Sequence, residues 1–455
     1  MARTVKKKKE LTLEEKLAEA LVPVEEQPYQ VPENWYWTKV GAVCSFIGGG
    51  TPSKNTPEYW NGGIPWASVK DIKGDYLLET QDHISDLGFQ NSATNMCDEE
   101  DLLLVTRIEP AKTIISKIKT SINQDLKIVK SYLSSIFLHY YFKNFQHVFE
   151  SKASGSTVKG ITIPNIENTP IPLPPLPEQQ RIVDRIESLF AKLDEAKEKA
   201  QAVVDGFEDR KAAILHKAFT GELTKGWRNE KKISLSTWKN VIMQDVCEKI
   251  TCGKTPKDFI SNEGEIPYLK VYNIVNNEVA FENAPQYIPL EIHNGRLSSS
   301  ILKPNDVIMN IVGPPLRKIA IIPDTYKEWN MNQAIVRFRP KEGLYYRYLY
   351  YALINPETLD AVIIATRGVV GQANISVSQS RNLKIQIPSL EEQKEIVRVL
   401  DIILMHETQA KEVAEQVISQ IDTMKKSILA RAFRGELGTN DPADESAMEL
   451  LKRIL

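Results

Sequence analysis

Basic and amide side chains gather beside predicted strand ends and glycine-rich turns in two separate stretches of this 455-residue chain. Such side chains can hydrogen-bond the edges of nucleic-acid bases or neutralise phosphates. Arg107, Lys159, Arg317 and Arg367 are the first choices because of those positions, although any one of them taken alone is more simply a solvated surface charge. The full candidate set is Lys54, Asn55, Lys70, Arg107, Lys112, Thr157, Lys159, Lys254, Lys257, Lys270, Asn273, Arg317, Lys318, Arg367 and Gln372.

The net charge counts against nucleic-acid binding. The chain carries a formal charge of −2 at pH 7 and has a pI near 6.4, whereas nucleic-acid-binding domains are generally basic. Binding would therefore need an uneven charge distribution. Acidic residues such as Glu178, Asp184 and Glu187 concentrate in a predicted helix, which leaves the basic candidates in the segments outside it.

One helical segment is present twice. Residues 176–223 and 390–437 lie 214 positions apart and align without a gap, and 18 of the 48 aligned residues are identical. A period of this length excludes a solenoid, so the chain contains a duplicated module. Apolar residues recur at spacings of three and four over about five heptads in each copy, which predicts a long helix and favours a coiled coil. Glu407 interrupts the apolar positions where the first copy has Leu193. Two separate amphipathic helices are the alternative.

The intervening segments repeat more loosely. Thr51-Pro52 matches Thr255-Pro256, and Asn123-Gln124 matches Asn332-Gln333, while the loops between these landmarks diverge. Short apolar runs predict strands at residues 101–106, 113–117, 306–312 and 318–323. Residues 132–150 and 344–355 predict helices, whose aromatic faces we assign to the core rather than to base stacking. One scaffold under two sets of loops suits a protein that binds two different short targets, because loops carry specificity.

Catalytic and metal-binding patterns are weak. Residues 46–50 match the F-x-G-x-G form of a cofactor-binding turn, but the equivalent residues 250–254 lack it. The sequence has no Asn-Pro-Pro-aromatic or Asp-Pro-Pro-aromatic motif, which would hold a flipped base. It also has no GxxxxGK[ST] phosphate loop. The six histidines lack metal-ligand spacing. We therefore expect no catalytic residue, cofactor or metal site, and keep a self-contained DNA methyltransferase as an alternative.

Several motifs recur in a fixed order along the chain. They are Gly48-Gly49-Gly50-Thr51-Pro52-Ser53 and Gly253-Lys254-Thr255-Pro256, then Pro174-Pro175-Leu176-Pro177-Glu178-Gln179-Gln180 and Pro388-Ser389-Leu390-Glu391-Glu392-Gln393, then Lys217-Ala218-Phe219-Thr220-Gly221-Glu222-Leu223 and Arg431-Ala432-Phe433-Arg434-Gly435-Glu436-Leu437. As an ordered set they resemble the specificity (S) subunit of type I restriction–modification systems. The resemblance covers nearly the whole chain from about residue 31.

The resemblance implies an α+β fold. Two α/β target recognition domains would alternate with two long conserved helices, which pair as an antiparallel coiled coil and give an internal pseudo-two-fold repeat. The expected boundaries are 1–30 for a basic N-terminal arm and short helix, 31–175 for the first recognition domain, 176–225 for the central helix, 226–387 for the second recognition domain, and 388–455 for the C-terminal helix and tail.

The resemblance also implies a non-catalytic subunit. Each recognition domain would contact one half of a split site in double-stranded DNA. The helices would set the spacer between the half-sites and dock two methyltransferase (M) subunits, and restriction (R) subunits would join that complex. A coiled-coil scaffold or adaptor without DNA recognition is a further alternative.

Composition is that of an ordinary globular protein, with 42% hydrophobic and 25% charged residues. No apolar run approaches the about 18 residues needed to span a membrane, and no secretory signal is visible, so we expect no membrane association and a cytoplasmic location. Cys44 and Cys247 match in the repeat and indicate buried structural thiols. Thr12 and Glu15 have capping-box spacing; the helix that they predict follows a basic cluster and is either a solvated arm or docked on residues 449–455.

Overall fold

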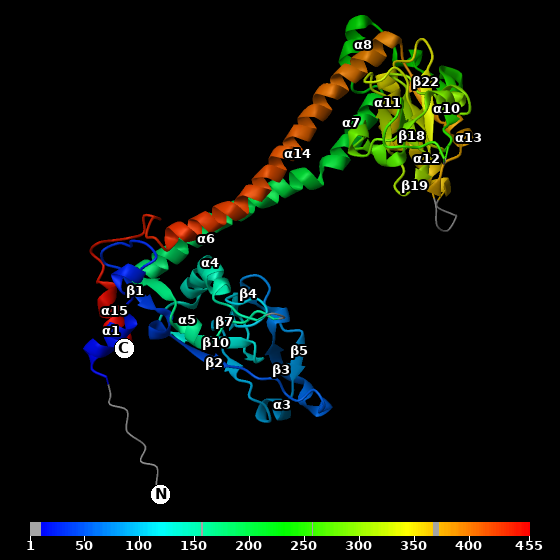
Figure 1. Ribbon diagram of the computed structural model, residues 1–455. Helices are drawn as coiled ribbons and strands as arrows, with labels where there is room; N and C mark the ends of the chain where they lie inside the picture. Colours follow the sequence, from blue (N-terminus) through cyan, green and yellow to red (C-terminus); the bar gives the residue numbers. More distant parts are fainter. Residues whose placement is uncertain (1–10, 156–157, 257, 367–372) are drawn as a thin grey trace. The chain divides into compact units, whose positions relative to one another are not determined.

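The computed structural model describes residues 11–155, 158–256, 258–366 and 373–455 (Figure 1). The chain divides into two compact units, the first made of Met1–Lys199 and Gln416–Leu455 and the second of Ala200–Glu415. Four of the candidates, together with the basic cluster at residues 3–9, lie outside the described residues. These four are Thr157, Lys257, Arg367 and Gln372.

The first unit contains two β-sheets and a two-stranded ribbon. The larger sheet has the strand order β2-β10-β7-β8-β4, and all its pairings are antiparallel except that of β4 with β8. The smaller sheet has the order β5-β3-β9-β6, and β1 pairs with β11 in the ribbon. The strands are β1 (Tyr36–Lys39), β2 (Cys44–Gly48), β3 (Trp60–Ala67), β4 (Tyr76–Leu77), β5 (Asp82–Ile84), β6 (Met96–Cys97), β7 (Leu102–Val105), β8 (Thr113–Ser116), β9 (Thr120–Ile122), β10 (Leu126–Ser131) and β11 (Pro170–Leu173).

Helix α4 (Ser135–Ser151) packs on β7 and β8 and supplies much of the aromatic core of this unit. Phe137, Tyr141 and Phe142 are fully buried, so the assignment of this face to the core is confirmed. Tyr132 is 75% exposed because it precedes the helix. The shorter helices are α1 (Leu13–Ala20), η1 (Val24–Glu26), α2 (Val40–Val43), η2 (Pro57–Tyr59), η3 (Val69–Asp71), α3 (Asp86–Gln90), α5 (Ile163–Glu167) and α15 (Ala447–Ile454).

The ends of the described chain meet within the first unit. Thr12 and Glu15 form the expected capping box at the start of α1. Helix α1 contacts α15, the Lys16 ammonium group donates to the carbonyl oxygen of Leu455, and Leu17 packs on the same core as Leu450. For this helix, docking on the C-terminal residues is therefore confirmed over the solvated-arm alternative.

The second unit is built on a similar plan, with fewer strands in its two main sheets and two additional strand pairs, β15-β16 and β19-β23. Its main sheet has the strand order β13-β22-β18-β20, its second sheet has the order β17-β14-β21, and β12 pairs with β24. The predicted strands at 101–106, 113–117, 306–312 and 318–323 correspond to β7, β8, β18 and β20. The strands are β12 (Lys239–Ile242), β13 (Cys247–Cys252), β14 (Ile266–Leu269), β15 (Ile274–Val275), β16 (Glu278–Val279), β17 (Tyr287–Ile288), β18 (Val307–Asn310), β19 (Val312–Gly313), β20 (Ile319–Ile321), β21 (Asn330–Met331), β22 (Ile335–Pro340), β23 (Ala373–Asn374) and β24 (Lys384–Ile387).

Helix α11 (Tyr346–Ile354) packs on the main sheet of the second unit as α4 does in the first. Its Tyr348 and Leu349 are fully buried, again in agreement with a core face. The other short helices of the second unit are α8 (Lys225–Lys231), η4 (Leu235–Thr237), α9 (Met243–Val246), η5 (Val271–Asn273), η6 (Phe281–Asn283), α10 (Leu290–Asn294), η7 (Ser298–Ser300), α12 (Pro356–Thr366) and α13 (Val377–Arg381).

The duplicated segments form long helices, but the two copies differ. The second copy is one continuous helix, α14 (Leu390–Ala432), whereas the first is divided at Gly206 into α6 (Leu176–Asp205) and α7 (Phe207–Phe219). The prediction of one unbroken helix is therefore wrong for the first copy. Gly221 and Gly435 follow the helix ends with φ of +78° and +74°, the left-handed conformation that glycine adopts readily at a helix C-terminus.

A side-chain network explains both the break and the irregular apolar pattern. Arg210 donates from Nη2 to the carbonyl oxygen of Val203 at 2.8 Å and from Nε to Glu407 Oε2 at 2.7 Å. The guanidinium thus satisfies a carbonyl beside the break, and Glu407 supplies its counter-charge. Glu407 interrupts the apolar positions because it faces this arginine.

Ion pairs link the two copies in the first unit. Lys425 Nζ lies 2.5 Å from Asp194 Oδ1, and Lys197 Nζ lies 3.4 Å from Asp422 Oδ1. As the residue number rises on α6, that of its partner falls on α14. Within the described part of the chain, no helix combines the length and apolar character needed to cross a membrane.

Candidate nucleic-acid interface

A glycine–threonine–proline loop after β2 packs against the turn between β9 and β10. The Gly50 amide donates to the Ile122 carbonyl at 3.0 Å, and Thr51 donates from its hydroxyl to the Gln124 side chain. Any Cβ at Gly49 would lie 2.2 Å from the carbonyl oxygen of Asn123. Gly49 is therefore required by close backbone packing.

The second unit builds the same loop with partly different residues. The Thr255 hydroxyl donates to the Gln333 side chain, and the amide of Lys254 donates to the Met331 carbonyl at 3.3 Å. A Cβ at Gly253 would lie 2.0 Å from that same oxygen. Gly253 thus corresponds to Gly49, and an exposed lysine replaces the following glycine without altering the contact.

These loops also account for the F-x-G-x-G match at residues 46–50. Strand β2 ends at Gly48, and the next helical element is η2, which starts at Pro57. A dinucleotide-type turn needs a helix N-terminus directly after the glycines to bind phosphate. The glycines here serve backbone packing instead.

A cleft of about 770 Å³ opens beside the Thr51–Gln124 contact in the first unit. Lys54 and Lys70 line it, as do Trp60 and Ile108. Lys70 Nζ lies 3.5 Å from Asp82 Oδ2, and both side chains are substantially exposed. The cleft therefore combines apolar surface with exposed lysines, which can contact bases and phosphates, and with the carboxylates of Asp82 and Asp125.

Other candidates of the first unit lie at the edge of this cleft. Arg107 Nη1 is 3.2 Å from Oδ1 of Asp125, a cleft residue. Lys159 is adjacent, since its carbonyl accepts the Ile108 amide at 2.9 Å. Lys112 pairs with Glu109 at 2.6 Å in the same loop. The structure thus brings together residues from positions 54 to 159. Asn55 is exposed beside Lys54.

In the second unit the consecutive residues Arg317 and Lys318 make contacts with different segments. Lys270 lies over the Tyr272 ring at 6.0 Å, and Lys318 Nζ donates to the Val271 carbonyl at 3.4 Å, so these two lysines flank one turn. Arg317 forms an ion pair with Asp360 on α12.

Asn273 is a correction to the candidate set. Its side chain is buried, its Oδ1 accepts the Lys270 amide at 2.9 Å, and its Nδ2 donates to the Ala284 carbonyl at 3.2 Å. Both ends of the amide stabilise the turn, so Asn273 serves the fold. The equivalent Asp71 makes the same turn with Ser68.

Sequence patterns missed Lys127 on β10. Its Nζ donates to the Gln124 carbonyl at 3.2 Å, and burial lowers the pKa of its ammonium group. Because Gln124 lines the cleft, the Lys127 ammonium group lies near it, and lysines commonly contact phosphates. The one available signal was its position three residues after Gln124, which contacts Thr51 in the loop.

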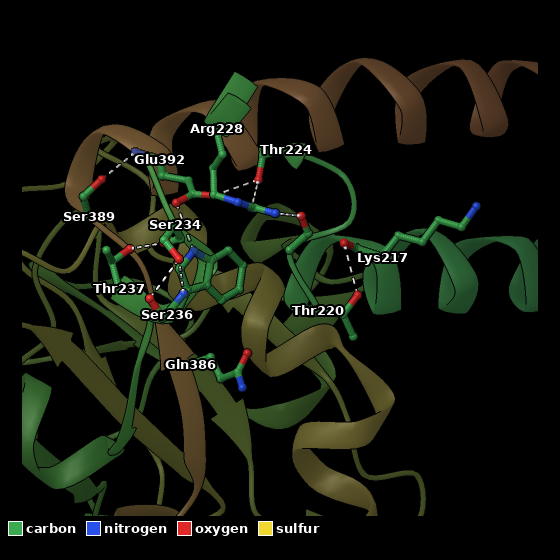
Figure 2. Close-up of polar contacts among 12 residues, drawn as sticks. Lys217, Thr220, Thr224, Arg228, Ser234, Ser236, Thr237, Gln386, Ser389 and Glu392 are labelled. Carbon is green, nitrogen blue, oxygen red and sulfur yellow. Dashed lines mark hydrogen bonds and ion pairs between the residues drawn. The ribbon is translucent and has the colours of Figure 1, made fainter. Parts of the chain in front are cut away.

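The base of each long helix carries a buried carboxylate. In the second unit, Glu392 accepts from Arg228 Nη1 at 2.7 Å, from the Thr224 hydroxyl at 2.9 Å and from the Trp238 indole at 2.9 Å. Figure 2 shows Arg228 and Thr224 converging on this carboxylate. The network joins the start of α14 to the first residues of the β-domain of this unit, which is the part that contains its sheets.

Glu178 occupies the matching position in the first unit. It accepts from the Trp35 indole at 2.7 Å, from Asn440 Nδ2 at 2.8 Å and from the Thr439 hydroxyl at 3.3 Å. Residues that follow α14 therefore donate hydrogen bonds to Glu178, as residues that follow α7 donate to Glu392. Trp35 and Trp238 thus make matching bonds to the two buried carboxylates.

The cysteines are free thiols. Burial raises the pKa of both Cys44 and Cys247 to about 12, so these matched thiols stay protonated and unreactive near neutral pH. Cys252 is partly exposed. Among the described residues, no group of three or more His, Cys, Asp and Glu side chains is placed to hold a metal ion.

Comparison with known protein families gives one match that recurs. The family described as "Type I restriction modification DNA specificity domain" matches residues 32–204 and again residues 235–416. The two matched segments follow the internal repeat.

Curated proteins with similar sequences carry related descriptions. The type I restriction enzyme EcoBI specificity subunit of Escherichia coli is 25% identical, over 88% of this chain and 83% of its own length. The EcoKI specificity subunit of Escherichia coli K12 is 22% identical, over 93% and 96%. The MjaVIII specificity subunit of Methanocaldococcus jannaschii is 25% identical, over 90% and 94%.

Solved structures show the same fold. The HsdS subunit from Thermoanaerobacter tengcongensis superposes with a TM-score of 0.63 at 20% identity, over 90% of this chain and 99% of its own. A chain from a study of complex assembly and conformational transition in the type I restriction–modification system superposes with a TM-score of 0.67 at 20% identity, over 90% and 100%.

Proposed function

Because this chain belongs to the type I restriction–modification DNA specificity family, we propose that it is the subunit that gives such a complex its DNA sequence specificity. Each β-domain contacts one half of a bipartite site in double-stranded DNA. The observation that carries the proposal is the loop framework built twice, at Thr51–Gln124 and Thr255–Gln333, under different exposed side chains. A shared framework with different surfaces is what two different half-sites require.

The proposed division of the chain follows the expected boundaries. Residues 31–175 and 226–387 form the recognition domains, residues 176–225 and 388–455 form the helical regions, and residues 1–30 form an N-terminal arm. Proline-marked strand ends at β11 and β24, which lead directly into α6 and α14, support the two domain-to-helix boundaries.

The long helices act as an antiparallel coiled coil that spaces the two domains within a pseudo-two-fold chain. The Asp194–Lys425 and Lys197–Asp422 ion pairs support this arrangement. A helix of about 40 residues is about 60 Å long, and one turn of DNA is about 34 Å. Half-sites separated by such a spacer have unread bases between them.

The helices also dock two methyltransferase subunits, and restriction subunits join this complex. Five large apolar side chains along α14 are exposed, and a docked subunit would bury them. The chain itself contributes no catalysis, and the proposed role places it in the cytoplasm with the DNA. The exposed apolar residues of α14 are Leu390, Ile402, Met405, Val413 and Met424.

The test is a methylome. Cells that express this chain with its cognate methyltransferase subunit are compared with cells that lack only this chain. We expect a split, asymmetric methylated motif that disappears with the chain. If the same motif stays methylated without it, the scaffold alternative replaces the recognition role.

A matched variant separates recognition from assembly. Lys54→Glu with Lys70→Glu reverses two charges in the cleft, whereas Glu391→Lys changes an exposed charge at a helix base. The cleft variant should lose DNA binding while still binding methyltransferase. An equal loss of DNA binding in both variants would count against a DNA-binding cleft.

A further inference from the structure

The loop between β7 and β8 is fixed at its base although its tip is exposed. The Thr106 amide donates to the Asp125 carbonyl at 2.8 Å, and the Ala111 amide donates to the Val105 carbonyl at 2.9 Å. Arg107 forms a β-bridge with Gly160. The backbone of Arg107 is therefore held in place from two directions before its side chain emerges.

A carboxylate orients the emerging side chain. Asp125 lies 3.2 Å from Arg107 Nη1, and their side chains are 13% and 55% exposed, respectively. Asp125 is itself held, because its amide donates to Asn123 Oδ1 at 3.1 Å and its carboxylate accepts from Gln124 Nε2 at 3.3 Å. A guanidinium that is already oriented by an ion pair with a fixed carboxylate loses little conformational freedom when its remaining N–H groups bind a target.

The neighbouring residue adds apolar surface at the same edge. Ile108 has a φ of +78°, is 57% exposed and lines the cleft. A β-branched residue avoids the left-handed region, and strained backbone of this kind is concentrated at functional sites. At the edge of the cleft, the Arg107 guanidinium offers paired N–H donors and the Ile108 side chain offers apolar surface.

The equivalent loop of the second unit also carries an arginine paired with a carboxylate, but at the other end of the loop. Arg317, between β18 and β20, has a φ of +73° and pairs with Asp360. The two carboxylates come from different elements, a turn in one unit and α12 in the other. An arginine–carboxylate pair therefore occurs in this loop of both units, at opposite ends of the loop and with different partners.

We propose that Arg107 is a specificity-determining residue that recognises a guanine in the half-site of the first β-domain, with Asp125 as its positioning residue. The proposal rests on the proposed function. Two N–H groups of a guanidinium match the O6 and N7 acceptors of guanine in the major groove. A phosphate is the poorer partner, because Asp125 neutralises the arginine and would repel a phosphate group.

The test determines the methylated motif for the full chain, co-expressed with its methyltransferase subunit, as wild type and as Arg107→Ala, Arg107→Lys and Asp125→Asn. We expect the wild-type motif to contain a guanine at one position of one half-site. Arg107→Ala should relax discrimination there by roughly 10-fold to 100-fold, the range of one bidentate base contact. The other half-site should not change.

Arg107→Lys decides between base and phosphate recognition, because lysine keeps the charge and loses the fork. Relaxed specificity in Arg107→Lys, and a weaker effect at the same position in Asp125→Asn, would support the proposal. Glu109→Gln is the control in the same loop and should leave the motif unchanged. Co-purification with the methyltransferase subunit verifies that each variant assembles.

Two results would overturn the inference. One is uniformly weaker methylation with an unaltered motif in Arg107→Ala that Arg107→Lys restores, since it identifies a phosphate contact. The other is an unaltered motif at full methylation in Arg107→Ala. If the wild-type chain itself confers no motif, the proposed function fails, which is a different outcome from either of these.

Discussion

Glu392 has a fully buried side chain and carries a charge, a combination that proteins retain only when the charge is paired and hydrogen-bonded. Arg228 is almost as buried, lies 2.7 Å from it, and sits over the Trp238 ring at 5.7 Å. Three donors from two different segments therefore meet on one carboxylate, which fixes the angle at which α14 leaves β24.

Removal of this carboxylate should be costly. Glu392→Ala leaves the Arg228 guanidinium buried without its partner, and we expect the unfolding free energy to fall by about 3–5 kcal/mol. Urea unfolding curves of the full chain, fitted transition by transition, measure this.

Glu391→Ala is the adjacent control. Glu391 pairs with Lys231 at 3.2 Å on the surface, and exposed pairs contribute about 0–1 kcal/mol. Equal effects of the two substitutions would show that Glu392 has no special structural role.

At the scale of the elements, the two helical copies differ at one place. Gly206 divides the first copy, and Arg210 and Glu407 occupy positions where the other copy has Met424 and Leu193, respectively. The pair is partly exposed. It replaces an apolar contact by an ion pair beside a helix break.

The repeat itself supplies the substitutions that test this pair. Arg210→Met with Glu407→Leu inserts the residues of the opposite copy, and we expect the double variant to be at least as stable as wild type, because apolar replacement of a partly buried ion pair is commonly neutral or stabilising. Arg210→Ala alone should lower the unfolding free energy by about 1 kcal/mol, since Glu407 and the Val203 carbonyl lose a donor. Thermal unfolding compares the three proteins. A double variant weaker than Arg210→Ala would contradict this account.

At the scale of the whole molecule, one family model matches two segments of the chain, and each unit has its own core. Exchange of residues 31–175 for the corresponding domain of another family member should change only one half of the recognised sequence. The methylated motif reports this directly. A change in both halves would contradict independent recognition.

The spacer should follow the helices. One heptad inserted into each long helix lengthens it by about 10 Å, which corresponds to about three base pairs at roughly 3.4 Å each. We expect a motif with the same half-sites and a longer unread gap. An unchanged gap would mean that the helices do not set the spacing.

The sequence by itself determined the order of the elements and the duplicated helix. Period-3.6 and period-2 patterns are local, so strands β7, β8, β18 and β20 and the aromatic core faces could be predicted within a few residues. The bonds of Trp35 to Glu178 and of Trp238 to Glu392 appear only in the structure.

Only the tertiary structure decided which of the basic residues share a site. Arg107, Asp125 and Lys159 are distant in sequence and meet because β7, β10 and the segment after α4 converge at one edge. In the second unit, bonds to Lys270 and Ala284 bury Asn273, which its amide side chain had made a candidate. The helix break at Gly206 also escaped the pattern, because its stabilising partner Glu407 lies on the other copy. Side-chain type determines which chemistry is possible, whereas long-range packing determines which groups meet and which remain exposed.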